Sequence, residues 1–390
     1  MEAPWAGWIP GVLNKGQMRE LWEKGFLMGE GAPDKALDQS AVDLSLSDVA
    51  FKMTQGSVKP PGPVAYNWFI EHEKLGRRHQ PLSDGIFKLD AKETYVFKLR
   101  ERLNPRLADG QIYGQATAKS SVGRVDVLAR LIVDGMDSYE GFTPAGLKSG
   151  DMYLEITPIT FDVLVKAGIR LSQLRLFYGN PKDVEMKGEL LFKRVLHDAD
   201  QLDGSLSVNL TNEVIGGCPV AAFCADSSTS QGQAIPLWQE ENGKKPDPCK
   251  HWKFVRSDAS SRLVIERDKF YLLRSKEKIS VPPGIAIYCR ASDETIGEMR
   301  IHYAGFAHPF FGYGRHGAEG TPLIFEVRGH QVNVTLSHAE KMANLTFYRM
   351  SVDCEKDESS YQNQSLDLSK FFGPWPERLK VGADGTVEKA

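Results

Sequence analysis

Hydrophobic and polar residues alternate with a period of two in several short stretches of this chain, which is the pattern of a half-buried β-strand. The clearest example begins after Ala41, where Val42, Leu44 and Leu46 alternate with polar residues. Further strands are predicted at residues 95–99, 153–157, 161–165 and 171–177. Gly, Pro and Asp residues separate these runs, so we predict a mainly β chain built from short strands.

A helical period occurs near the N-terminus. Met18, Leu21 and Trp22 stand at positions i, i+3 and i+4, and Gly25 follows as a stop signal. The sequence therefore predicts a short amphipathic helix over residues 17–24. A later segment, residues 56–89, is rich in Pro, His and charged residues, and we expect it to form a long insertion or connecting loop.

The second half of the chain repeats the first. One gapless alignment keeps glycines, an acidic residue and strand residues in phase. The matched pairs are Lys119 with Arg290, Ser121 with Ser292, Gly141 with Gly312, Phe142 with Tyr313, Gly146 with Gly317, Glu155 with Glu326, and Gln173 with Asn344. Residues 41–46 also resemble residues 206–210 at a different offset. We therefore expect two tandem β domains, 1–178 and 204–390, each a small jelly roll or distorted barrel, joined by a linker at 179–203.

The composition argues against several classes of function. At 390 residues and 43.4 kDa the chain is long enough for two domains, and its formal net charge of −3 gives no general attraction for nucleic acid or an anionic membrane. No apolar run reaches the roughly 18 to 20 residues of a membrane span, and the N-terminus lacks the pattern of a secretory signal. The 5 cysteines are irregularly spaced, which argues against a disulfide framework. We therefore expect a cytoplasmic protein without nucleic-acid or membrane partners.

A short run combines two hydroxyl side chains, a glycine and two flanking cations. Its residues are Lys119, Ser120, Ser121, Val122, Gly123 and Arg124. Hydroxyls, backbone N–H groups and Lys or Arg side chains are the donors that phosphate oxygens need. Taken alone, such a cluster usually marks a turn. A single carboxylate, Glu155, follows on a predicted strand, and the combination indicates nucleotide binding together with acid–base chemistry.

These motifs, in this order, resemble the dCTP deaminase branch of the dUTPase-like superfamily. The phosphate loop of that family reads Arg-Ser-Ser-x-x-Arg and is similar to residues 119–124, and its early strand Thr-Val-Asp-Val-x-Leu is similar to residues 41–46. Its catalytic glutamate ends an apolar strand, as in residues 153–156 and 324–327. A Tyr-x-x-Gln tail that covers the nucleotide is matched by residues 361–364. The tandem layout resembles the double-domain dCTP deaminases of some bacteria, which implies two dUTPase-like distorted jelly-roll or β-barrel domains with few short helices.

The resemblance implies metal-free hydrolytic deamination of dCTP to dUTP and ammonia in pyrimidine deoxynucleotide metabolism. A strand glutamate would act as general acid and base. Glu155 is the first candidate and Glu326 the second, with Arg124 and Ser120 as the other catalytic residues. Mg²⁺ would accompany the triphosphate, without a metal site in the protein. The residues expected to hold the substrate are Lys119, Ser120, Ser121, Arg124, Arg290, Ser292, Tyr361 and Gln364. The chain also lacks the combination of a His-x-Glu with a Pro-Cys-x-x-Cys element that zinc-dependent deaminases use, because no Pro-Cys-x-x-Cys run occurs.

Members of this family assemble as trimers in which the Ser-Ser loop of one subunit meets the glutamate of its neighbour. The resemblance therefore implies a homo-oligomer, a trimer of two-domain chains, in which threefold symmetry places the first halves in one ring. In that arrangement Glu155 faces the loop. A second arrangement pairs the first-half loop with Glu326 and the tail at Tyr361 and Gln364, within one chain or between chains.

Two other functions stay open on the sequence. One is dUTPase-like pyrophosphate hydrolysis, alone or combined with deamination. The other is nucleotide binding without catalysis, because Asp293 and Glu294 in the second-half loop would repel phosphates. His308 and His316 lie in or near an aromatic run at residues 306–313, where we expect structural histidines rather than acid–base groups.

Overall fold

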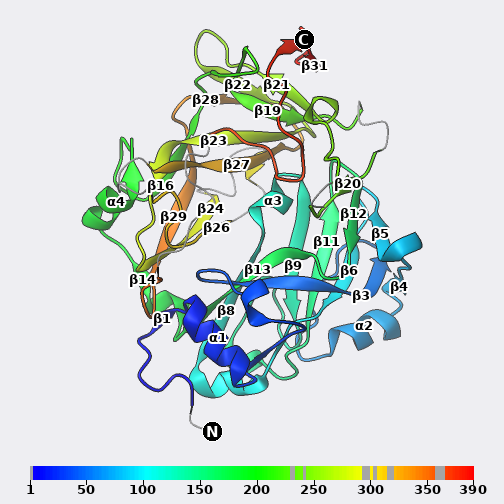
Figure 1. The fold of residues 1–390 in the computed structure, drawn as a ribbon, viewed down its shortest axis with the longest axis vertical. Coiled ribbons are helices and arrows are strands. Elements are labelled where there is room, and N and C mark those ends of the chain that lie inside the picture. The colour runs from blue at the N-terminus through cyan, green and yellow to red at the C-terminus, as the bar shows by residue number, and fades with distance from the viewer. Residues whose placement is uncertain are drawn as a thin grey trace.

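The computed structural model of the chain describes residues 3–228, 233–239, 243–291, 299–301, 305–313, 320–355 and 365–390. Over these residues the chain is mainly β, and its strands form two halves. Figure 1 shows the first half, blue to green, in the lower part of the view, and the second half, green to red, in the upper part. The mainly β, two-part architecture predicted from the sequence is confirmed.

Most of the strand residues of the first half belong to one large sheet. Its strands are β1 (Gly11–Val12), β2 (Leu27–Met28), β3 (Val42–Met53), β4 (Gly76–Arg78), β5 (Ile86–Leu89), β6 (Tyr95–Leu99), β7 (Arg102–Leu103), β8 (Ile112–Ala118), β9 (Val127–Val133), β10 (Gly141–Phe142), β11 (Met152–Pro158), β12 (Val163–Lys166) and β13 (Arg170–Tyr178). Its helices are α1 (Lys15–Glu23), α2 (Tyr66–His72) and α3 (Ser120–Gly123), with 3-10 turns η1 (Pro33–Lys35), η2 (Ser83–Gly85), η3 (Pro105–Gly110) and η4 (Pro144–Gly146). The strand order of the large sheet is β10-β8-β13-β3-β6-β11-β9.

The second half is built in the same way. Its strands are β14 (Glu185–Met186), β15 (Leu196–His197), β16 (Ser205–Asn209), β17 (Glu213–Ile215), β18 (Cys218–Val220), β19 (Ala222–Ala225), β20 (Ile235–Pro236), β21 (Trp252–Val255), β22 (Arg262–Ile265), β23 (Phe270–Ile279), β24 (Ile285–Ala291), β25 (Met299–Ile301), β26 (Gly305–Ala307), β27 (Thr321–Gly329), β28 (Val334–Ser337), β29 (Lys341–Arg349), β30 (Leu379–Val381) and β31 (Val387–Lys389). Helix α4 (Glu189–Val195) and the 3-10 turns η5 (Pro181–Asp183) and η6 (Pro248–Lys250) complete it. The main sheet has the order β21-β19-β23-β16-β29-β24-β26, with β27 beside β23.

Equivalent strands in the two halves carry the same buried polar contact. On β3, Ser45 donates both its backbone N–H and its hydroxyl to Glu101, at 2.7 Å each. On β16, Ser207 makes the same two bonds to Glu277, at 2.6 Å each. Both serines stand on the strand that pairs with the long strand β13 or β29. The matched contacts confirm that the two halves are structural repeats.

The gapless sequence alignment is wrong by two residues along one strand pair. Gln173 on β13 and Asn344 on β29 are equivalent, but Gln173 pairs with Thr117 and Asn344 pairs with Arg290. Arg290 is therefore the counterpart of Thr117 and not of Lys119. Loops of unequal length shift the register between strands, and a gapless alignment cannot follow such a shift.

Helix α1 forms where the sequence predicted it. Asn14 caps the helix, since its side chain accepts from the backbone N–H of Gln17 at 2.9 Å, while the Gln17 side chain accepts from the N–H of Asn14 at 3.1 Å. Met18 and Leu21 are fully buried. The capping box fixes the start of the helix and the apolar face holds it on the sheet.

The segment expected to be an insertion or loop and the segment expected to be a linker both contain regular structure. The predicted loop at 56–89 includes α2, β4 and β5, because Tyr66 and Ile70 stand one helical turn apart and both are buried. The predicted linker at 179–203 includes β14, α4 and β15. Strands β14 and β15 pair with β29 and β23, so two short parts of this segment join the sheets of the second half.

Buried contacts fix the two halves against each other. The ring of Phe161 packs on Trp252 with 6.0 Å between centroids, and β20 of the second half pairs in parallel with β12 of the first. Arg175 on β13 is fully buried, donates to the backbone oxygen of Ile287 at 2.9 Å and lies 4.0 Å over the ring of Phe306. The boundary between the halves is thus a packed interface.

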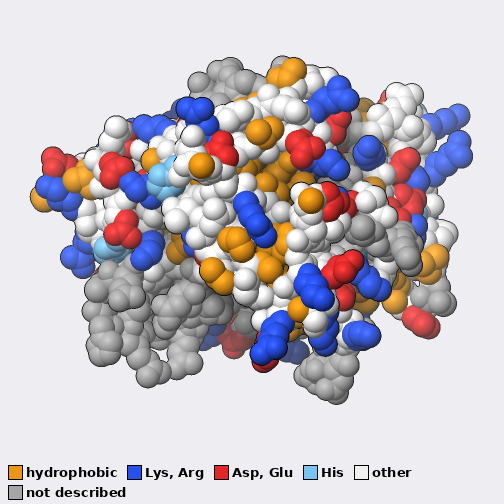
Figure 2. Space-filling model, turned by 90° about the horizontal axis from the view of Figure 1, so that it is seen from above, with side chains coloured by type: hydrophobic (Ala, Val, Ile, Leu, Met, Phe, Trp, Pro, Cys, Tyr) orange, Lys and Arg blue, Asp and Glu red, His pale blue; other side chains and the backbone are white. Residues whose placement is uncertain are grey.

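The surface carries charges of both signs. Figure 2 shows Lys and Arg side chains interspersed with Asp and Glu over the end of the molecule that the second half forms. This mixture agrees with the small net charge of the chain. Among the helices that the structure describes, none is long and apolar enough to cross a membrane.

Candidate functional site

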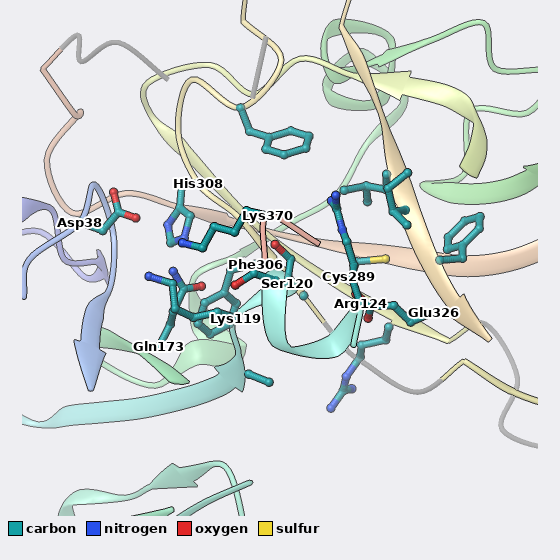
Figure 3. Close-up of a pocket in the computed structure, with 18 residues that line it drawn as sticks. Asp38, Lys119, Ser120, Arg124, Gln173, Cys289, Phe306, His308, Glu326 and Lys370 are labelled. Atoms are coloured by element: carbon teal, nitrogen blue, oxygen red, sulfur yellow. The ribbon is translucent and has the colours of Figure 1, made fainter. Parts of the chain in front are cut away.

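A cavity of about 260 Å³ lies between the two halves. The first half contributes β8, α3 and β13, and the second contributes β24, β26, β27 and a segment near the C-terminus. The polar residues from the first half are Asp38, Lys119, Ser120, Ser121, Arg124 and Gln173. Those from the second half are Cys289, Arg290, His308, Glu326 and Lys370. Figure 3 shows Asp38 and His308 at one end of the cavity, Glu326 at the other, and Ser120 between them.

The predicted phosphate loop forms the single helical turn α3. Lys119 precedes the turn in an extended conformation, and its carbonyl accepts from the backbone N–H groups of Val122 at 2.8 Å and Gly123 at 3.2 Å. The side chain of Val122 is fully buried and anchors the turn to the core. As a result Ser120, Ser121 and Arg124 all reach the cavity wall. The residues that the sequence grouped as phosphate ligands are therefore together in space.

Lys119 is oriented by a carboxylate on the neighbouring strand. Its Nζ forms an ion pair with Asp43 on β3. The other oxygen of Asp43 accepts from Nε2 of Gln173 at 3.3 Å. All three side chains are largely buried or half-buried, so the pair holds the ammonium group at the cavity edge.

A second lysine approaches the same loop from the C-terminal segment. Ser369 donates its hydroxyl to the backbone oxygen of Ser121 at 2.6 Å, which fixes this segment over α3. The next residue, Lys370, lines the cavity, and Figure 3 shows it close to Ser120 and Lys119. Burial, and next the charge of Lys119, lower the pKa of Lys370. The ammonium groups of Lys119 and Lys370 together make this end of the cavity positive, which creates a site for an anion.

Glu326 lies against the opposite end of α3. It is 5% exposed, and a β-carbon placed on Gly123 would lie 2.7 Å from its Oε2 and 2.8 Å from its Oε1. Burial raises the pKa of Glu326 to about 8; the charge of Arg124 opposes this shift and that of Asp126 adds to it. A carboxyl group that titrates near neutral pH can both take and give a proton in one reaction cycle.

Cys289 shares this end of the cavity. Burial and the nearby Glu326 raise the pKa of its thiol to about 12. The thiol therefore stays protonated at neutral pH and is a poor nucleophile. Among the cavity residues, Glu326 is the one suited to proton transfer.

His308 and Asp38 form the far end of the cavity. The Nδ1 atom of His308 lies 2.8 Å from the hydroxyl of Ser40, and burial lowers the pKa of His308 to about 4, so its ring is neutral at pH 7. Burial opposes the ionisation of Asp38, but His308 and the N–H of Gln39 lower its pKa. The sequence analysis expected His308 to be structural, and the structure places it both in a buried hydrogen bond and on the cavity wall.

Glu155 lies outside this cavity and is held by other residues. It is buried, pairs with Arg130 at 2.5 Å and accepts from the hydroxyl of Ser57 at 2.6 Å. Tyr139 and the backbone N–H of Val58 complete its surroundings, at 3.2 Å and 3.3 Å. Within the chain the phosphate loop therefore meets Glu326, the second candidate, and not Glu155, the first.

The remaining predicted residues divide into two groups. Arg290 lines the cavity from β24. Ser292, Tyr361 and Gln364 lie outside the described residues, as do Asp293, Glu294 and His316.

The sequence analysis missed several residues that line the cavity. They are Asp38, Gln173, Cys289 and Lys370. For Gln173 the sequence offered one signal, because this residue lies in the predicted strand 171–177 and aligns with Asn344 in the repeat. The other three residues reach the cavity only through contacts between distant parts of the chain.

Two family models match the chain, one in each half. The model for the 2'-deoxycytidine 5'-triphosphate deaminase (DCD) N-terminal domain matches residues 9–180, and the model for the C-terminal domain of the same enzyme matches residues 194–372. The chain belongs to the dCTP deaminase family. Both halves of this family's two-domain form are thus present, in the expected order.

A solved structure supports the same family and fold. The chain is similar to the crystal structure of 2'-deoxycytidine 5'-triphosphate deaminase from Agrobacterium tumefaciens, with 26% sequence identity and a TM-score of 0.76. The match covers 88% of this chain and 97% of the other. No curated protein sequence matches the chain at a significant level. The similarity over nearly the full length of the solved chain shows that the dCTP deaminase family's tandem fold is retained here.

Proposed function

We propose that this protein catalyses the hydrolytic deamination of dCTP to dUTP and ammonia, and that Glu326 is its general acid and base. The observation that supports this assignment most directly is the contact between Glu326 and α3. A buried carboxyl group with a pKa of about 8 lies against a turn that carries two hydroxyls and two cations. Family membership supports the choice of substrate, and the geometry supports the choice of residue.

The triphosphate of dCTP binds at the first-half side of the cavity. Ser120 and Ser121 offer hydroxyl donors, while Lys119, Arg124 and Lys370 supply positive charge. An Mg²⁺ ion arrives with the nucleotide, bound to its phosphates. Placing the phosphates along α3 directs the base toward the second-half side of the cavity, where Glu326 lies.

In our proposal, the reaction beside Glu326 proceeds by proton transfer and uses no protein-bound metal. Glu326 takes a proton from a water molecule as the oxygen adds to C4 of the cytosine ring. The carboxyl group passes this proton to N3. The carboxylate then takes the remaining proton from the C4 oxygen and gives it to the amino group, and ammonia leaves with the bonding electrons of the C4–N bond, so that uracil is formed. One dCTP and one water are thus converted to one dUTP and one ammonia.

Arg124 contributes to both parts of this site. It is 9% exposed and directly follows Gly123, the residue against which Glu326 lies. A nearby cation favours the carboxylate form of Glu326 and lowers its pKa, against the effect of burial. Arg124 therefore keeps the pKa of Glu326 within reach of neutral pH.

The trimer of two-domain chains remains our proposal for the assembly. The described part of the cavity is formed by the two halves of one chain. Deaminase activity per chain is therefore expected to change little when the protein is diluted until trimers dissociate. Sedimentation velocity over a concentration series, measured beside ammonia release, tests this expectation.

The test of the function is ammonia release from Mg-dCTP by the wild type, Glu326→Gln and Glu155→Gln. We expect the wild type and Glu155→Gln to release ammonia and Glu326→Gln to lose at least about 100-fold in turnover while still binding dCTP. Loss of activity in Glu155→Gln alone would move the general base to the other glutamate. Pyrophosphate release measured in the same samples identifies a bifunctional enzyme. Binding of dCTP without any product by the wild type would identify a nucleotide-binding protein instead.

A further inference from the structure

A buried ion pair crosses between the two halves beside Glu326. Arg328 stands two residues beyond Glu326 on β27, and side chains at this spacing point to the same face of a strand. The guanidinium group of Arg328 pairs with the carboxylate of Asp126, which lies in the turn between α3 and β9. Asp126 is fully buried, and the side chain of Arg328 is 11% exposed. The pair joins the strand that carries Glu326 to the turn that follows Arg124.

Further hydrogen bonds fix the geometry of this pair. Nη2 of Arg328 donates to the hydroxyl of Thr160 at 2.6 Å, and that hydroxyl donates to Asp126 at 2.5 Å. Nη1 of Arg328 donates to the backbone oxygen of Asp268 at 2.7 Å. The backbone N–H of Asp126 donates to the oxygen of Gly123 at 2.8 Å, so the backbone of this residue is tied directly to α3. Neither partner can move without breaking several bonds.

A buried ion pair contributes little net stability in general, because desolvation of the two charges offsets their attraction. The value of such a pair lies more often in fixing one arrangement of the groups around it. We propose that the Asp126–Arg328 pair is a positioning device, which holds Glu326 against Gly123 and Arg124 across the boundary between the halves. This inference rests on the proposed role of Glu326.

The charges around Glu326 make the effect of the Asp126–Arg328 pair measurable as a shift in the pKa of Glu326. From the first half Arg124 and Asp126 face its carboxyl group, from β24 the protonated thiol of Cys289 faces it, and Arg328 stands on its own strand. Burial raises the pKa of Glu326, and the negative charge of Asp126 raises it further. Removing the charge of Asp126 therefore lowers the pKa, while removing the charge of Arg328 exposes Glu326 to an uncompensated Asp126 and raises it.

The experiment compares Asp126→Asn, Arg328→Gln and the double variant with the wild type. The dependence of kcat/KM on pH is measured for Mg-dCTP, together with kcat and KM at one pH. We expect kcat to fall by about 10- to 100-fold in each single variant, because Glu326 is displaced, with a smaller change in KM. The rising limb of the pH profile should move down in Asp126→Asn and up in Arg328→Gln, each by on the order of one pH unit. In the double variant, which has lost both charges, the limb should return toward the wild-type position.

A matched control separates positioning from simple stability. Asp226 is a buried aspartate that pairs with Lys253 at 3.2 Å and lies outside the cavity. Asp226→Asn should lower thermal stability without moving the pH limb or kcat. The inference would be overturned if Asp126→Asn and Arg328→Gln had identical pH profiles, because a pair that only stabilises the fold does not shift the pKa of Glu326 in either variant. If Arg328→Gln does not fold, Arg328→Lys retains the charge, and we expect it to keep the wild-type limb while losing kcat; a wild-type kcat would contradict the positioning role.

A direct titration distinguishes failure of this inference from failure of the proposed function. The C=O stretch of protonated Glu326 is followed by infrared difference spectroscopy against Glu326→Gln, which requires no turnover. An inactive wild type in which Asp126→Asn still lowers the titration midpoint refutes the deaminase function and supports the contact between the pair and Glu326. An active wild type whose midpoint is unmoved by either substitution refutes the inference alone.

Discussion

The carboxyl group of Glu326 lies against the backbone of Gly123, so closely that a β-carbon on this glycine would come within 2.7 Å of Oε2. The two residues belong to different halves of the chain, and Glu326 also lines the cavity between these halves. Gly123 has an ordinary helical backbone in α3, which any residue could adopt. The reason for glycine here is therefore the space that Glu326 occupies.

Gly123→Ala tests this contact. Alanine is a better helix former than glycine, so the substitution should cost little in the turn itself, but its methyl group forces Glu326 away from the site. We expect turnover of Mg-dCTP to fall by about 10- to 100-fold while dCTP binding is largely retained. Gly16→Ala in α1, where the new β-carbon meets only Asn14 at 3.4 Å, is the matched control and should be fully active. Full activity in Gly123→Ala would show that Glu326 does not need its observed position.

The raised pKa of Glu326 also links stability to pH. Burial raises this pKa from 4.5 to about 8, so between these values the folded protein keeps a proton that the unfolded chain releases. The free energy of unfolding therefore falls as pH rises through this window. Glu326→Gln removes the effect, and we expect its urea midpoint to exceed that of the wild type above about pH 8 and to vary less with pH. Glu388→Gln, at an exposed site on β31, is the control; parallel curves for the wild type and Glu326→Gln would contradict the assignment.

Local patterns in the sequence were sufficient for much of the fold. The alternating runs predicted β6 at its observed bounds and placed β11, β12 and β13 to within two residues; for β3 they gave the start at Val42 but not the end at Met53. The phosphate loop and one strand glutamate were also identified, because each is a short contiguous motif. A helix such as α2 was missed because its buried positions, Tyr66 and Ile70, stand in a polar, proline-rich context.

The choice between the two glutamates could not be made from local sequence. Glu155 and Glu326 end similar apolar runs on equivalent strands, β11 and β27. Their surroundings differ because of distant residues: Ser57, which binds Glu155, is 98 positions away. No pattern along one strand contains that information, so the expectation that favoured Glu155 rested on the assumed ring of first halves and not on the local sequence.

Glu155 should contribute to stability rather than to turnover. Its carboxylate is buried and accepts bonds from Arg130, Ser57 and Tyr139. Glu155→Gln keeps the size of the side chain but leaves Arg130 without a counter-charge, and we expect a loss of roughly 1 to 3 kcal/mol in the free energy of unfolding. Urea unfolding measures this loss, and the double variant with Arg130→Met shows whether the two effects are coupled. Additive effects would mean that the ion pair contributes nothing.

Lys370 should act in substrate binding and not in the chemical step. Its segment is fixed over α3 by the bond from Ser369 to Ser121, and its ammonium group adds to the charge of Lys119 at the phosphate end of the cavity. Glu326 is at the other end (Figure 3). We therefore expect Lys370→Met to raise KM for Mg-dCTP by about tenfold, the effect of one charge-assisted bond, with kcat nearly unchanged. Lys244→Met, at an exposed position outside this cavity, is the control. A fall in kcat at constant KM would instead connect Lys370 to proton transfer, because loss of a phosphate contact weakens binding alone.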